Sequence, residues 1–183
     1  MKHTVIALAA LSVAASALAQ GTVNFTTRSG TTVNAPVTYA SGGALVLGTG
    51  ANAVLGQLYA SAPGGTLAAI GAPTPFRSDA GAGYITAGGE VAIPGTSLGG
   101  SGSVKLVAWY ASQGATYADA MAKGQGGFGE SAVLTVNGLG GGTTPPALLA
   151  GLSGFQVSAI VPEPSIAALG LLGAGLLLIR RKK

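Results

Sequence analysis

The sequence contains no cysteine, and its only histidine is His3. Without cysteine the chain forms no disulfide, holds no thiolate-bound metal and uses no thiol in catalysis. Charged residues are also scarce, at 8% of the chain against about 25% in an average soluble domain. The composition therefore leaves few side chains able to carry out chemistry.

The formal net charge of +4 at pH 7 comes from the ends of the chain. The part between residues 20 and 160 is neutral, because its basic and acidic side chains balance: Arg28, Arg77, Lys105, Lys123, Asp79, Glu90, Asp119 and Glu130. Nucleic-acid binding needs a basic surface, so we expect no nucleic-acid partner. The acids stand singly, without the spacing of a calcium loop, and we expect no metal and no other cofactor.

The first 19 residues have the pattern of a secretory signal peptide. Lys2 supplies the positive start, an apolar run follows at residues 4–15, and Ala17 and Ala19 are small residues where signal peptidase requires them. We predict cleavage before Gln20, which removes His3; the triplet Ala15-Ser16-Ala17 fits the same rule. A Ser-His-Asp triad is then excluded in the mature chain. The G-x-S-x-G match at residues 95–99 is interpreted as a glycine-rich turn, and no catalytic residue is predicted.

A second apolar segment lies at residues 166–179 and is followed by a basic cluster of Arg180, Arg181, Lys182 and Lys183. As a helix rising about 1.5 Å per residue, the segment covers about 21 Å of a hydrocarbon core about 30 Å thick. Snorkelling of the basic side chains and thinning of the bilayer make up the difference. We predict a transmembrane helix with the basic cluster on the cytoplasmic side and residues 20–160 outside.

Directly before this segment stands the motif Pro162-Glu163-Pro164. Motif, apolar segment and basic end, in this order over residues 161–183, resemble the PEP-CTERM sorting signal of Gram-negative bacteria. The resemblance implies that an exosortase, a membrane-embedded protease, recognises the motif and releases the protein to the cell surface or extracellular matrix. It also implies a transient stay in the membrane and an association with exopolysaccharide and biofilms. It assigns no activity to residues 20–160.

Residues 20–160 predict an all-β domain. Short runs rich in Val, Thr, Leu, Tyr and Phe alternate with glycine clusters, which favours a glycine-rich antiparallel β-sandwich, jelly-roll-like, between the signal helix and the transmembrane helix. The expected strands are residues 22–27, 33–39, 44–47, 54–60, 67–70, 84–86, 90–93, 104–110, 131–136 and 155–160. One short helix is expected at residues 117–123, with Thr116 as its N-cap.

Trp109 and Tyr110 are adjacent on an expected strand and therefore point to opposite faces. One ring is expected in the core; if the other is exposed, it could stack on a sugar ring beside Lys105 or Glu90. Trp109 and Tyr110 are thus candidate sugar-stacking residues, although the favoured interpretation is that both rings pack against the sheet. Arg77 and Asp79 are expected to form an ion pair in a loop.

These observations favour an exported, non-enzymatic protein with a structural or adhesive role. Its expected partners are signal peptidase, an exosortase-like protease, the membrane and extracellular polysaccharide. One alternative is a secreted glycan-cleaving enzyme that uses two of the four acids as a pair. Another is a membrane-anchored protein that retains its tail, with Pro162-Glu163-Pro164 as a stiff linker.

Overall fold

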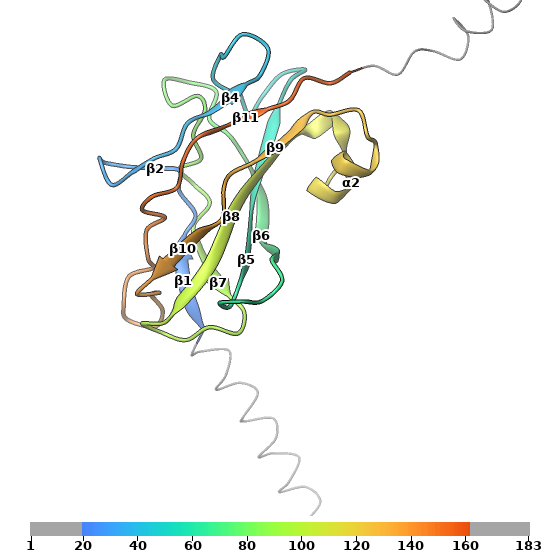
Figure 1. Cartoon of the computed structure of the whole chain (residues 1–183). Coiled ribbons are helices and arrows are strands. Elements are labelled where there is room, and N and C mark those ends of the chain that lie inside the picture. The colour runs from blue at the N-terminus through green and yellow to red at the C-terminus, as the bar shows by residue number, and fades with distance from the viewer. Residues whose placement is uncertain (1–19, 162–183) are drawn as a thin grey trace, which may run out of the picture.

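The computed structural model describes residues 20–161. The expected signal peptide, the Pro162-Glu163-Pro164 motif, the expected transmembrane helix and the basic cluster all lie outside these residues. Figure 1 shows the described part as strands, with a small amount of helix at one end. The expectation of an all-β domain is confirmed.

The strands carry the labels of Figure 1. They are β1 (Gly21–Asn24), β2 (Arg28–Ser29), β3 (Val33–Asn34), β4 (Val37–Tyr39), β5 (Val54–Ser61), β6 (Ala68–Pro75), β7 (Glu90–Ile93), β8 (Ser101–Tyr110), β9 (Phe128–Glu130), β10 (Leu134–Asn137) and β11 (Phe155–Val157). A 3-10 turn, η1 (Ala111–Gln113), and a helix, α2 (Tyr117–Ala122), follow β8.

The largest unit is a five-stranded antiparallel sheet built around β8. Its order is β10-β8-β5-β6, and β9 pairs with the same side of β8 as a second short strand. β10 pairs with the beginning of β8, opposite Ser101–Val104, and β9 with its end, opposite Val107–Trp109. Since β8 and β5 form the longest run of paired residues, they set the positions of the side chains on both faces of this sheet.

Two shorter strand pairs, β1 with β7 and β4 with β11, lie against the inner face of this sheet. A third short pair is β2 with β3. The β4–β11 pair is parallel, which departs from the wholly antiparallel arrangement expected. This pair brings together residues that are far apart in the sequence: Phe155 of β11 lies opposite Val37 of β4.

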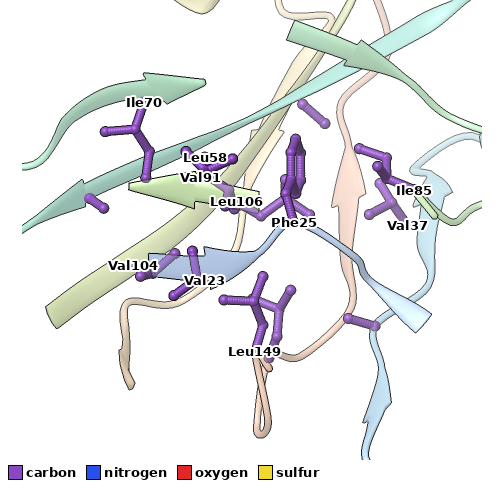
Figure 2. Packing of buried hydrophobic residues seen from close by; sticks show 14 of the residues in the cluster. Val23, Phe25, Val37, Leu58, Ile70, Ile85, Val91, Val104, Leu106 and Leu149 are labelled. Atoms are coloured by element: carbon purple, nitrogen blue, oxygen red, sulfur yellow. The ribbon is translucent and has the colours of Figure 1, made fainter. Parts of the chain in front are cut away.

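The main core lies between the five-stranded sheet and the β1–β7 and β4–β11 pairs. Val104, Leu106 and Ala108 of β8 are buried in it, as the alternation along the strand predicts. Figure 2 shows Phe25 at the centre of this cluster, together with Leu58 and Leu106 of the large sheet. This core is one continuous cluster that takes side chains from β1, β4, β5, β6, β7, β8, β10 and β11, so these strands form one packed unit.

Two expected strands do not form. Residues 44–47 contribute only a single bridge, Thr38 with Leu45, and residues 84–86 are irregular. Ile85 is nevertheless completely buried, so the apolar pattern correctly indicated burial but not a strand ladder. Its carbonyl accepts a hydrogen bond from Thr27 N at 2.9 Å, which satisfies the backbone without regular pairing.

The expected strand at 33–39 is divided into β3 and β4 by Ala35 and Pro36, because proline has no N–H to donate to a ladder. β9 was not expected, since its sequence is rich in glycine. Gly129 lies so close to β11 that a Cβ atom there would overlap the backbone of Gln156. The missing side chain is therefore what allows β9 and β11 to approach each other.

Candidate functional site

The residues predicted to direct sorting lie outside the described part of the chain, with one exception. Outside it are Ala17, Ala19, Pro162, Glu163, Pro164, Arg180, Arg181, Lys182 and Lys183. The exception is Gln20, which directly precedes β1. Among residues 20–161, none of the helices has the length and apolar character that crossing a membrane requires.

The regular structure begins and ends close to these predicted signals. Gly21 N donates to Thr96 Oγ1 at 3.2 Å, and Thr22 N donates to the Gly140 carbonyl at 2.9 Å. At the other end, Val161 N donates to the Gln125 carbonyl at 2.8 Å. The start of β1 and the chain that follows β11 lie at opposite ends of the domain (Figure 1).

Neither Trp109 nor Tyr110 is exposed, so their candidacy as sugar-stacking residues is wrong, and the favoured interpretation that both rings pack is confirmed. Trp109 is 0% exposed and Tyr110 6%, although they do point to opposite faces of β8. Trp109 Nε1 donates to the Gly114 carbonyl at 3.0 Å, while the Tyr110 ring stacks on Tyr39 with 5.7 Å between centroids. The inner face is covered by the core and the outer face by α2, so neither ring is free to stack on a sugar.

The outer face of the large sheet carries a second cluster, in which helix and sheet meet. Val107 and Trp109 of β8 pack there with Tyr117 and Ala120 of α2. Phe128 of β9 joins them, edge-on to Tyr117 with 5.8 Å between centroids. In Figure 1, α2 lies beside the ends of β8 and β9, and the rest of the outer face extends beyond it.

Next to this aromatic cluster, the outer face carries Tyr59, Lys105 and Glu130, which form the candidate site. Tyr59 of β5 lies directly opposite Lys105 of β8, and Glu130 of β9 lies opposite Val107. Lys105 Nζ is 2.7 Å from Glu130 Oε2, and the Tyr117 hydroxyl donates to the same oxygen at 3.1 Å. The half-buried Tyr59 ring lies edge-on to Tyr117, with 5.9 Å between centroids.

The electrostatics of this site keep Glu130 ionised. The hydrogen bond from Lys105 lowers the pKa of Glu130 below its ordinary value, although partial burial opposes this effect. Burial raises the pKa of the Tyr117 phenol, and the Glu130 charge raises it further. At neutral pH the site therefore holds a carboxylate, its ammonium partner and a neutral phenol, with a net charge of zero.

Two of the other three acids of the described residues, Asp79 and Asp119, have structural roles, and the third, Glu90, is exposed on β7. Asp79 pairs with Arg77, as expected, and also accepts from Gly81 N; mainly the hydrogen bond from Arg77 lowers the pKa of Asp79 to about 2. Asp119 accepts from Thr116 N at the start of α2. A glycosidase needs one carboxylic acid whose pKa is raised, whereas the pKa shifts of Asp79 and Glu130 are downward. Neither Asp79 nor Glu130 therefore has the raised pKa of a glycosidase proton donor.

Tyr59, the aromatic residue that lies opposite Lys105, was not among the residues that the sequence analysis proposed; those were Trp109 and Tyr110. Tyr59 lies in a correctly predicted strand, with Leu58 and Ala60 facing the core, so its outward direction follows from alternation. Its position opposite Lys105 depends on the register between β5 and β8. These strands are not consecutive in the chain, so the sequence does not indicate that register. Glu130 and Tyr117 reach the site from β9 and α2, and no spacing in the sequence indicates that they meet.

No family model, curated protein or solved structure matches this chain.

Proposed function

We propose that this chain is an exported surface or extracellular-matrix protein, processed by an exosortase-like protease, with a structural or adhesive role and no enzymatic activity. In this proposal the body is a glycine-rich, jelly-roll-like β-sandwich. It is made with a removable signal helix before it and a transmembrane sorting helix after it. The tail resembles the PEP-CTERM signal, and that resemblance supplies the association with exopolysaccharide and biofilm.

One observation supports the proposal above the others: the packed β body lies between the two predicted processing points. β1 begins at Gly21, directly after the predicted signal-peptide site. At the other end, Ile160 pairs with Gly126 and Val161 N bonds to Gln125, directly before Pro162-Glu163-Pro164. Cuts at these two places would leave every described strand intact.

A structural or adhesive role agrees with the chemistry of the body. The rings of Trp109 and Tyr110 are used in packing, and the acids Asp79, Asp119 and Glu130 each bond to neighbouring groups. The body is neutral and has neither histidine nor cysteine after the signal peptide. A β scaffold with this composition suits a structural or adhesive role better than proton transfer or nucleophilic attack.

Intact mass tests the processing. We expect protein from the culture medium to begin near Gln20 and to end close to Pro162-Glu163-Pro164. Glu163→Ala should leave the tail in place and keep the protein with the cells, whereas Glu90→Ala, an exposed acid on β7, should be processed normally. Wild-type protein that still carries the four basic residues of the tail would contradict the proposal and favour the retained membrane anchor.

A further inference from the structure

We propose that the outer face around Tyr59, Lys105 and Glu130 binds a neutral pyranose chain, with Tyr59 as the stacking ring. This inference deepens the adhesive role proposed above and depends on it for its biological setting. The binding itself is a property of the described β body and can be tested separately.

The first argument is the position of Tyr59. It is half buried, held edge-on by Tyr117, and lies on β5, with β8 on one side and the edge strand β6 on the other. The negative face of an aromatic ring attracts the weakly positive C–H groups of a pyranose, just as it attracts the edge of another ring. A ring held in place by packing loses little conformational entropy when it binds.

The second argument is the hydrogen-bonding capacity beside the ring. The side chains of Lys105 and Glu130 are 19% and 50% exposed. An ammonium has three donors and a carboxylate about four acceptor positions. The Lys105–Glu130 contact uses one of each, and the Tyr117 hydroxyl uses one more acceptor. Donors and acceptors remain for sugar hydroxyls, which both donate and accept.

The third argument is the charge. Lys105 and Glu130 neutralise each other at 2.7 Å, and residues 20–160 are neutral as a whole. An acidic polysaccharide would have to compete with Glu130 for the ammonium group, whereas a neutral sugar can bond to the pair without separating it. Charge complementarity therefore favours a neutral chain.

The residues flanking Tyr59 leave room for an extended ligand. Opposite Tyr59 on β6 is Ala69, which is exposed. Two positions before Lys105 on β8 is the half-exposed Ser103, and opposite Ser103 on β10 is the exposed Thr135. These small side chains point to the same face as Tyr59, so a chain can cross several strands without meeting a bulky side chain.

Packing of α2 on the sheet explains the positions of Tyr117, Trp109 and Phe128 but makes no use of the exposed parts of Tyr59, Lys105 and Glu130.

A tyrosine outside the proposed site serves as the control that separates an effect on binding from an effect on stability. Tyr84 is also a half-buried tyrosine; its hydroxyl donates to Asn34 and its ring lies 5.0 Å from the Arg28 guanidinium. Tyr84 belongs to none of the strands of the large sheet, whereas Tyr59 lies on β5.

The test is a calorimetric titration of the full-length chain, held in a zwitterionic detergent without a sugar headgroup, with cellohexaose as the probe. We expect binding with a dissociation constant at or below the millimolar range, weakened about tenfold or more by Tyr59→Ala. Tyr59→Phe keeps the ring and should bind within about twofold of the wild type. Lys105→Met, which keeps the aliphatic stem, should weaken binding, and Tyr84→Ala should have no effect.

Absence of cellohexaose binding by a folded wild-type chain would overturn the inference, as would equal losses in Tyr59→Ala and Tyr84→Ala. Tighter binding of hexagalacturonate than of cellohexaose would overturn the assignment to neutral sugars. Far-UV circular dichroism of each variant verifies the fold. Since this titration does not involve export, its failure is distinguishable from a failure of processing, which the intact mass reports.

Discussion

Glu130 joins the large sheet to α2 through a single oxygen atom. Its Oε2 accepts hydrogen bonds from Lys105 Nζ of β8 and from the Tyr117 hydroxyl of α2. The Glu130 side chain is half exposed, so solvent screens the ion pair and limits its contribution to stability. The carboxylate therefore matters more for the positions of Lys105 and Tyr117 than for the stability of the whole fold.

Glu130→Gln should destabilise the protein by less than about 1 kcal/mol, because it removes a screened ion pair and keeps an acceptor for Tyr117. The pKa of Glu130 is lowered in the folded state. The wild-type contribution is therefore fully present above the ordinary carboxyl pKa and is lost as pH falls through the lowered folded value. Urea unfolding at neutral and acidic pH measures this: the difference between variant and wild type should shrink in acid. A difference independent of pH would contradict the assignment.

At the scale of elements, α2 depends on its cap and on its contacts with the sheet. A helix of six residues is too short to be stable alone in water. Thr116 accepts a hydrogen bond from Asp119 N, while Asp119 accepts one from Thr116 N, which together form a capping box. Tyr117 and Ala120 bury one side of the helix against β8. The predicted N-cap at Thr116 is confirmed.

Thr116→Ala should cost about 1 kcal/mol, and the effect should be local. Amide hydrogen exchange should become faster in α2, Tyr117–Ala122, and remain unchanged at Ser103 and Val104 of β8, which pair with β5 on one side and β10 on the other. Thr116→Ser retains the hydroxyl and serves as the control. Equal acceleration in α2 and β8 would mean that the helix is part of the global unfolding unit.

At the scale of the whole molecule, the last strand is essential to the core. β11 pairs in parallel with β4 early in the chain, and Val157 is completely buried in the cluster that also contains Val23 and Leu106. The two ends of the body are thus held by one core. Cooperative unfolding is the usual behaviour of such a unit.

We expect a chain of residues 20–161 to unfold in one transition, with the same midpoint by far-UV circular dichroism and by the fluorescence of Trp109. A chain that ends before Phe155 should be less stable by at least about 1.5–3 kcal/mol, the contribution of one buried apolar side chain such as Val157. Two separate transitions in the longer chain would show that the β4–β11 pair is independent of the large sheet.

Local patterns determined much of the fold. Short runs of β-forming residues between glycine clusters predicted β5, β7 and β8. Alternation predicted the side-chain directions in β8, because the direction of a side chain along a strand depends only on neighbouring residues. The cap predicted α2 for the same reason. The predicted residues 90–93 coincide with β7, and the inward direction of Val104, Leu106 and Ala108 is confirmed.

The sequence by itself determined that the body is all-β and has no net charge. For the parts outside residues 20–161, it supplied the predictions of export and sorting. Only the tertiary structure decided that β4 and β11 are parallel, that both faces of β8 are covered at Trp109 and Tyr110, and that Tyr59 lies opposite Lys105. The physical reason is range. Strand direction, register and burial depend on contacts between residues distant in the chain, and these contacts leave no periodic pattern in the residues themselves.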